Sequence, residues 1–111
     1  MAHEEVVTAI RHYLRVLGER GIPVRSGVLF GSWARDEADE WSDIDLVVVS
    51  PVFDARVDHD EVIKLLWRVA ARTDSRIEPV PCGERQWLED QSSAIIEIAR
   101  REGQIILADA A

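Results

Sequence analysis

Two aspartates at the start of an apolar segment are the residues of this chain best suited to chemistry. Asp43 and Asp45 lie at the entrance of the run Ile44 to Val49, which is almost continuously apolar and predicts a buried central strand. Side chains alternate along a strand, so both carboxylates would lie on one face. The two like charges repel each other, and a bound divalent cation such as Mg²⁺ would remove that cost. Alternatively, the pair only caps a strand at the surface.

A glycine and a serine follow the preceding apolar run. Val28 to Phe30 predicts a strand that ends at Gly31, and residues 33–37 can form a short helix capped by Ser32. Glycine allows a backbone to approach a ligand, and N–H groups at a helix start can receive phosphate oxygens. An ordinary turn with Ser32 as the helix cap would need no ligand. Together, a phosphate-binding turn and a metal-binding pair are the components that phosphoryl or nucleotidyl transfer requires.

The remaining pattern indicates the elements that must position these residues. Apolar periodicity predicts a helix over residues 4–20, a helix over 62–73 with Asp58 or Asp60 as its cap, and a helix over 94–99 that Ser92 or Ser93 caps and Gly103 ends. Short strands are expected at 76–80 and 105–107, and Pro79 places the former at a sheet edge or bulge. A less clear helical region follows Pro81-Cys82-Gly83. The order predicts an α/β or α+β fold, with a small mixed sheet flanked by helices.

Composition narrows the possible classes of protein. A length of 111 residues with 47% apolar and 31% charged residues suits one soluble domain over 1–111. No stretch approaches the about 18 consecutive apolar residues of a membrane span, and the N-terminus lacks a signal pattern, so we expect a cytoplasmic protein. The net charge of −8 argues against direct nucleic-acid binding. Cys82 is the only cysteine, and no histidine lies near it in the sequence to activate it as a nucleophile.

The segment GSWARDEADEWSDIDLVVV, residues 31–49, closely resembles the signature of the minimal nucleotidyltransferase domains of the DNA polymerase beta superfamily. The pattern is Gly31-Ser32 followed by Ser42-Asp43-x-Asp45. The helix at 62–73, the strand IEPVP at 77–81 and the ending REGQIIL are also similar to this family. The resemblance covers nearly the whole chain and implies a polymerase-beta-type nucleotidyltransferase fold.

The resemblance also implies a site. In that family the two aspartates hold two Mg²⁺ ions, the Gly-Ser turn grips the triphosphate of the substrate, here expected to be ATP, and a third carboxylate lies on a later strand. Glu78 is the matching candidate. Such a carboxylate can complete the metal site or take the proton from an attacking hydroxyl. Glu78 could instead be a solvated charge on an edge strand.

Three further residues belong to the same signature. Ser42 is counted with the nucleotide-binding residues, and Arg35 matches a basic residue that either contacts phosphate or pairs with Asp36, Glu37 or Asp39. Many relatives have glycine where this chain has Asp36, which adds negative charge near the expected triphosphate. Trp33 and Trp41 flank the signature and could stack on a base, although packing is the commoner use of tryptophan.

The resemblance finally implies an acceptor. Many freestanding members of the family are antitoxins that silence a HEPN-domain ribonuclease toxin by adenylylating one of its tyrosines. We therefore expect transfer of AMP from ATP to a hydroxyl of a partner protein. Two alternatives are nucleotidyl transfer to a small molecule such as an aminoglycoside, and a non-catalytic nucleotide-binding antitoxin that acts by occlusion. If Glu78 lies near the two aspartates, catalysis is favoured over occlusion.

Overall fold

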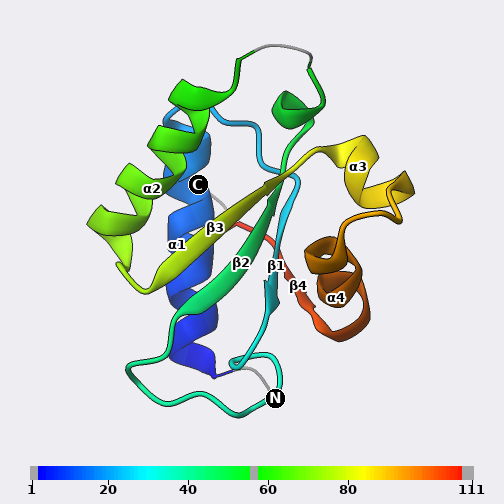
Figure 1. Cartoon of the computed structure of the whole chain (residues 1–111). Helices are drawn as coiled ribbons and strands as arrows, with labels where there is room; N and C mark the ends of the chain where they lie inside the picture. The colour runs from blue at the N-terminus through cyan, green and yellow to red at the C-terminus, as the bar shows by residue number, and fades with distance from the viewer. Residues whose placement is uncertain (1–2, 56–57, 109–111) are drawn as a thin grey trace.

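The computed structural model describes residues 3–55 and 58–108, and Figure 1 shows how their elements are arranged. Four strands form one mixed sheet in the order β3-β2-β1-β4, with helices on both of its faces. This α+β architecture confirms the predicted fold class. The elements are α1 (Glu4–Glu19), β1 (Ser26–Phe30), β2 (Ile44–Val49), the 3-10 turn η1 (Pro51–Asp54), α2 (Asp60–Thr73), β3 (Ile77–Cys82), α3 (Glu84–Glu89), α4 (Ala94–Glu102) and β4 (Gln104–Ile106).

Each face of the sheet has its own core. Helices α1 and α2 cover one face, and α3 and α4 cover the other (Figure 1). The larger core lies under α1 and α2 and includes Leu14, Leu46 and Leu66, whereas the smaller one lies under α4 and includes Val47 and Ile96. Residues of β2 alternate between the two cores, as expected for a strand that is buried on both faces.

The central strand β2 has different neighbours on its two sides. It pairs antiparallel with β1, and it pairs parallel with β3, to which the crossover helix α2 connects it. The end of β1 and the starts of β2 and β3 therefore lie at the same end of the sheet, the lower end in Figure 1. The prediction that Pro79 belongs to an edge strand is confirmed, because β3 is the outer strand on this side.

The structure differs from the sequence-based expectation at three places. The N-cap of α2 is His59, so the expectation that Asp58 or Asp60 caps this helix is wrong. Residues 33–36 form turns and residue 37 belongs to no regular element, so the expected short helix is wrong. Asp36 has a φ of 59°, in the left-handed region, which stops helical geometry after one turn. The unclear region after Gly83 contains a helix, α3, whose first turn is closed by a hydrogen bond from the Gly83 N–H to the Gln86 side chain.

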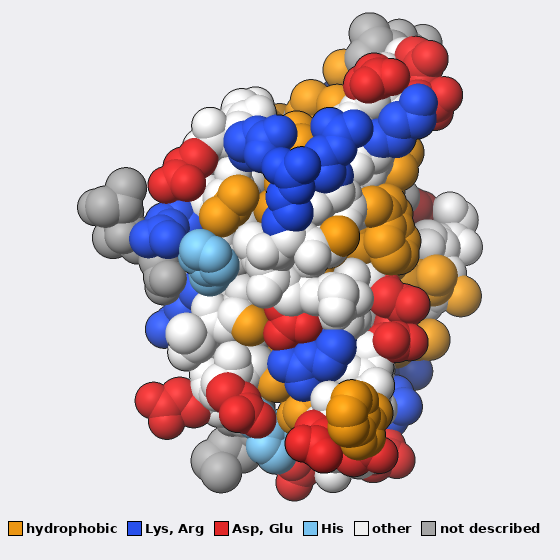
Figure 2. All heavy atoms as spheres, turned by 90° about the vertical axis from the view of Figure 1, so that its left-hand side faces the viewer, with side chains coloured by type: hydrophobic (Ala, Val, Ile, Leu, Met, Phe, Trp, Pro, Cys, Tyr) orange, Lys and Arg blue, Asp and Glu red, His pale blue; other side chains and the backbone are white. Residues whose placement is uncertain are grey.

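Charge is unevenly distributed on the face formed by α1 and α2. Figure 2 shows Lys and Arg side chains gathered over the upper half of this face and acidic side chains along its lower edge. That lower edge belongs to the end of the molecule where the loop between β1 and β2 lies. In the part of the chain that the structure describes, no helix combines the length and apolarity needed to cross a bilayer.

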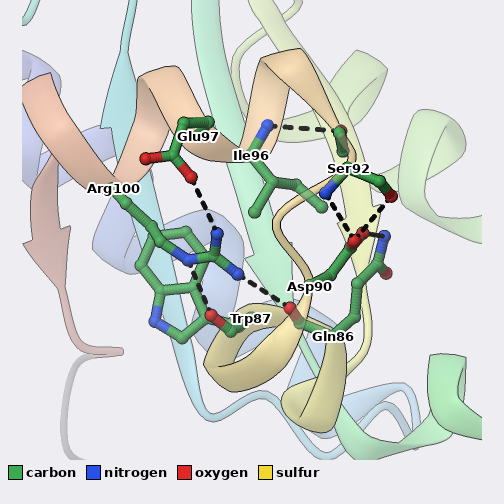
Figure 3. A network of polar contacts seen from close by, with 8 residues as sticks. Gln86, Trp87, Asp90, Ser92, Ile96, Glu97 and Arg100 are labelled. Atoms are coloured by element: carbon green, nitrogen blue, oxygen red, sulfur yellow. Dashed lines mark hydrogen bonds and ion pairs between the residues drawn. The ribbon is translucent and has the colours of Figure 1, made fainter.

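A single arginine joins α3 to α4 (Figure 3). The Arg100 guanidinium donates to the backbone carbonyls of Trp87 at 2.8 Å and Gln86 at 2.9 Å, at the end of α3. It also pairs with Glu97 and lies over the Trp87 ring, 5.4 Å from its centre. The Gln86 carbonyl also accepts the Asp90 N–H at 2.9 Å, whereas carbonyls nearer the end of a helix lack such a donor. A cation at this end satisfies them and complements the helix dipole.

We predict that Arg100→Met lowers the free energy of unfolding by about 1.5–3 kcal/mol, the range for hydrogen bonds to a charged group. The methionine keeps part of the apolar packing but leaves the Trp87 carbonyl without its donor and removes one of the two donors to the Gln86 carbonyl. Denaturant unfolding followed by circular dichroism measures the change. The matched control is Arg101→Met, at an exposed neighbouring position of the same helix, which should change stability by about 0.5 kcal/mol or less. Equal losses in the two variants would contradict the role of Arg100.

Candidate active site

The register of the sheet brings two carboxylates together. Asp45 is the second residue of β2, and its direct partners are Phe30 on β1 and Glu78 on β3. Residues paired across neighbouring strands point to the same face, so Asp45 and Glu78 are adjacent side chains. Asp43 lies two residues before Asp45 and is exposed at the same end of the sheet. The structure thus brings Asp43, Asp45 and Glu78 into one neighbourhood.

The electrostatics of these side chains show the same proximity. Partial burial raises the pKa of Asp45, and the Asp43 charge raises it further, while Arg35 opposes the shift. Desolvation also raises the pKa of Glu78, followed by the charge of Asp43 and then that of Asp45. The Asp43 charge therefore disfavours ionisation of both Asp45 and Glu78. A cation bound among them would offset this repulsion.

The carboxylates at this end of the sheet suit a hard cation by their chemistry. Among residues 3–55 and 58–108, no three His, Cys, Asp or Glu side chains are grouped tightly enough to hold a metal ion as they stand. Oxygen donors are the ligands that Mg²⁺ prefers, and Asp43, Asp45 and Glu78 supply only oxygen. The donor set therefore fits Mg²⁺ in kind.

The turn after β1 lies against the same carboxylate. Gly31 is buried with a φ of 76°, and a Cβ at this position would collide with the Asp45 side chain. Glycine is thus required both by the backbone conformation and by the close approach of Asp45. The N–H groups of Ser32 and Trp33 donate to no backbone carbonyl within the described residues, whereas those of the next four residues do. Successive unbonded N–H groups in a tight turn suit an anion such as phosphate.

Arg35 and Ser42 have partners within the protein. Arg35 pairs with Glu37 at 2.6 Å, one of the alternatives that the sequence left open, and with Glu102 of α4 at 3.5 Å. The Ser42 hydroxyl accepts from the Asp39 N–H at 3.0 Å and donates to the Asp39 carboxylate at 3.2 Å. Ser42 therefore holds the loop before β2, and its contact with a nucleotide stays a prediction. Glu102, which pairs with Arg35, and Asp39, which bonds with Ser42, are therefore also near the site.

The conformation of Asp36 explains its departure from the family pattern. Its φ of 59° is one that glycine adopts without strain and that aspartate tolerates better than most residues. The Asp36 carboxylate pairs with the His3 ring at 2.9 Å, on the surface. Aspartate at this position therefore preserves the turn that glycine would form, and its added negative charge is paired with the His3 ring.

The two tryptophans that flank the signature differ in their exposure to solvent. Trp33 is buried in the larger core, and its indole N–H donates to the Ser42 carbonyl at 3.2 Å, as expected for a packing role. Trp41 does not pack, since 83% of it is exposed.

Two other features lie apart from the carboxylates. Burial raises the pKa of Cys82 to about 11, so its thiol stays neutral and cannot serve as a nucleophile at pH 7. A hollow of about 400 Å³, lined by Asp54, Arg85, Gln86, Glu89 and Asp90, contains none of the predicted site residues.

Comparison with known proteins identifies the family. The family model described as "Nucleotidyltransferase domain" matches residues 10–102. This range includes Asp43, Asp45 and Glu78 as well as the Gly31-Ser32 turn. A search of curated proteins found no match.

We predict that Gly31→Ala destabilises the protein by about 2 kcal/mol or more. The left-handed conformation costs about 1–2 kcal/mol with a side chain, and the new methyl group must also displace the Asp45 carboxylate. Thermal unfolding measures the loss. Gly18→Ala is the control, because Gly18 lies in α1 with open space around it, and it should stabilise by up to about 1 kcal/mol. If Gly31→Ala unfolds like the wild type, the close approach of Gly31 and Asp45 is wrong.

We also predict opposite effects of Asp45→Asn with and without Mg²⁺. The raised pKa values of Asp45 and Glu78 mean that folding disfavours their ionised forms, so stability is lost as the pH rises from the unfolded to the folded pKa and stays low at pH 7. In chelator at pH 7, Asp45→Asn should therefore raise the Tm by about 1–5 °C, the equivalent of one unfavourable cross-strand pair. In millimolar Mg²⁺ the wild type should gain stability and the variant should not. An equal gain in both proteins would exclude Asp45 as a metal ligand.

Proposed function

The chain belongs to the nucleotidyltransferase domain family, and we propose that it transfers AMP from ATP to a hydroxyl group of a partner protein. The observation that carries this proposal is the direct pairing of Asp45 with Glu78 on neighbouring parallel strands, beside the Gly31 turn. This arrangement supplies a third carboxylate where an enzyme of this kind needs one. It favours catalysis over a protein that only occludes its partner.

The proposed chemistry assigns a task to each residue. The N–H groups of Ser32 and Trp33 bind the triphosphate, and Asp43, Asp45 and Glu78 would hold Mg²⁺, which neutralises charge on the phosphates when bound. The acceptor oxygen forms a bond to the α-phosphorus while the bond from that phosphorus to the bridging oxygen breaks, and pyrophosphate leaves. The third carboxylate, Glu78, either completes this metal site or accepts the proton of the attacking hydroxyl.

Exposed apolar side chains on α4 and on β4, the strand that pairs with β1, support a protein acceptor. Ile98 on α4 and Ile105 on β4 are 41% and 61% exposed, and α4 is joined to the turn by the pair of Glu102 with Arg35. A partner docked on such a surface could bring its hydroxyl in line with the leaving pyrophosphate. We propose a HEPN-domain ribonuclease as this partner, following the antitoxins that the signature resembles.

A small cationic acceptor is the second candidate. Besides Asp36, which pairs with His3, four exposed carboxylates lie in the loop before β2 and would attract a polycation such as an aminoglycoside: Glu37, Asp39, Glu40 and Asp43. Modification of a panel of aminoglycosides by the protein with ATP and Mg²⁺ would favour this acceptor over a protein.

The decisive experiment incubates the protein with labelled ATP, Mg²⁺ and the product of the neighbouring gene. We predict that AMP is transferred to that product and that Glu78→Gln lowers the rate by about 100-fold or more, the range for loss of a general base. Glu89→Gln makes the same chemical change at an exposed position of α3 and should leave the rate unchanged. Full activity of Glu78→Gln would place Glu78 outside the reaction.

Asp45→Asn separates catalysis from occlusion in cells. If adenylylation protects, this variant should bind the partner and fail to suppress its toxicity, and mass spectrometry of the wild-type pair should show added AMP. Protection by the variant without any AMP on the partner would mean that the protein acts by covering the toxin.

A further inference from the structure

The loop between the Gly31 turn and β2 carries an isolated aromatic side chain. Trp41 is 83% exposed, more than any other large hydrophobic side chain that the structure describes. Its sequence neighbours Asp39, Glu40 and Asp43 are exposed acidic residues. An indole ring in water among carboxylates gains nothing from packing, so its surface is available to a ligand.

This loop is held in one conformation by its own hydrogen bonds. The Asp39 carboxylate accepts from the Trp41 N–H at 2.9 Å and from the Ser42 hydroxyl at 3.2 Å. The Ser42 N–H donates in turn to the Asp39 carbonyl at 3.0 Å. Trp41 is therefore fixed at its backbone, although its ring projects into solvent.

Two contacts join the loop to the rest of the protein. The Ser42 carbonyl accepts from the buried Trp33 indole, and the Glu40 carbonyl accepts from Arg76 at 3.1 Å. Arg76 also lies over the Trp33 ring. Because the loop is already ordered, a ligand that stacks on Trp41 would not bear the entropy cost of ordering it.

Trp41 is close enough to the carboxylates to contact the substrate that binds there. It lies two residues before Asp43, so their Cα atoms are at most about 7.6 Å apart. A nucleotide whose phosphates bind near Asp43 extends its sugar and base over a similar length. A nucleobase can stack on a single flat ring such as the Trp41 indole. The faces of the base are uncharged, so the acidic residues of the loop do not repel it.

A protein interface would look different. Its centre is an extended apolar patch depleted of charged residues, whereas Trp41 stands alone among carboxylates. In Figure 2, hydrophobic surface at the lower end of the molecule is interspersed with acidic side chains in the same way. The surroundings of Trp41 therefore favour a base over a protein side chain.

We propose that Trp41 is the platform on which the base of the bound nucleoside triphosphate stacks. The inference rests on the proposed function, because the carboxylates and the Gly31 turn must hold the phosphates. Stacking on an aromatic ring tolerates any base. The protein should therefore bind MgATP and MgGTP alike, and both more tightly than MgUTP, whose ring is smaller.

Calorimetry with MgATP and with magnesium tripolyphosphate, which lacks a base, tests the proposal. We predict that Trp41→Ala weakens MgATP about 10-fold and leaves tripolyphosphate binding unchanged, while Trp41→Phe retains most of the affinity. Trp67→Ala is the control, since Trp67 is 47% exposed on α2 and should affect neither ligand. MgATP, but not tripolyphosphate, should also change the tryptophan fluorescence of the wild type, and Trp41→Phe should lose that change.

Other outcomes would overturn the proposal in distinguishable ways. Unchanged MgATP binding by Trp41→Ala would show that Trp41 does not contact the base. Equal weakening of both ligands would mean that Trp41 only supports the phosphate site. Unchanged MgATP binding with loss of AMP transfer to the partner protein would assign Trp41 to acceptor docking. If the wild type binds neither ligand in Mg²⁺, the proposed function fails together with this inference.

Discussion

The register of β2 between its two neighbours determines the position of every group at the candidate site. Ile44, Leu46 and Val48 are buried under α1 and α2, and this burial fixes which face of the sheet receives the alternate residues. A shift of one residue would place Asp45 in the larger core and an apolar side chain beside Glu78. The cost of burying an unpaired carboxylate makes that shift prohibitive. The same hydrophobic packing that stabilises the sheet therefore holds like charges next to each other.

Much of this arrangement could be predicted from the sequence. The alternation around Asp43 and Asp45, the apolar run that follows and the position of Gly31 each have a direct physical meaning, and the family signature joined them into one hypothesis. The adjacency of Asp45 and Glu78 was beyond the sequence pattern, because it depends on the crossover through α2 and on the parallel register of β2 and β3. No local pattern specifies which residues meet across a crossover of this length.

Other features depended on contacts that no local pattern specifies. The pair of Arg35 with Glu102 links residues far apart in the sequence, and the expected helix after Ser32 fails because Asp36 adopts a left-handed conformation. Periodicity could not separate Trp33, which is buried, from Trp41, which is exposed, since both flank the same motif. The signature predicts that Ser42 contacts the nucleotide, and only the folded chain shows that its hydroxyl also binds Asp39 within the loop. Exposure and hydrogen bonding of this kind require the folded chain.

The two prolines of β3 have a consequence for the behaviour of the protein in solution. The carbonyls of Arg76 and Cys82 receive hydrogen bonds from the β2 side, so the even-numbered residues of this strand face β2 and the odd-numbered ones face outward. Pro79 and Pro81 have no N–H to offer there, and the N–H of Ile77 is already bonded to the Asp74 carbonyl. This edge therefore has no donor left along Ile77 to Pro81 with which to recruit a strand from another molecule. The parallel side of the sheet is thereby protected against edge-to-edge aggregation.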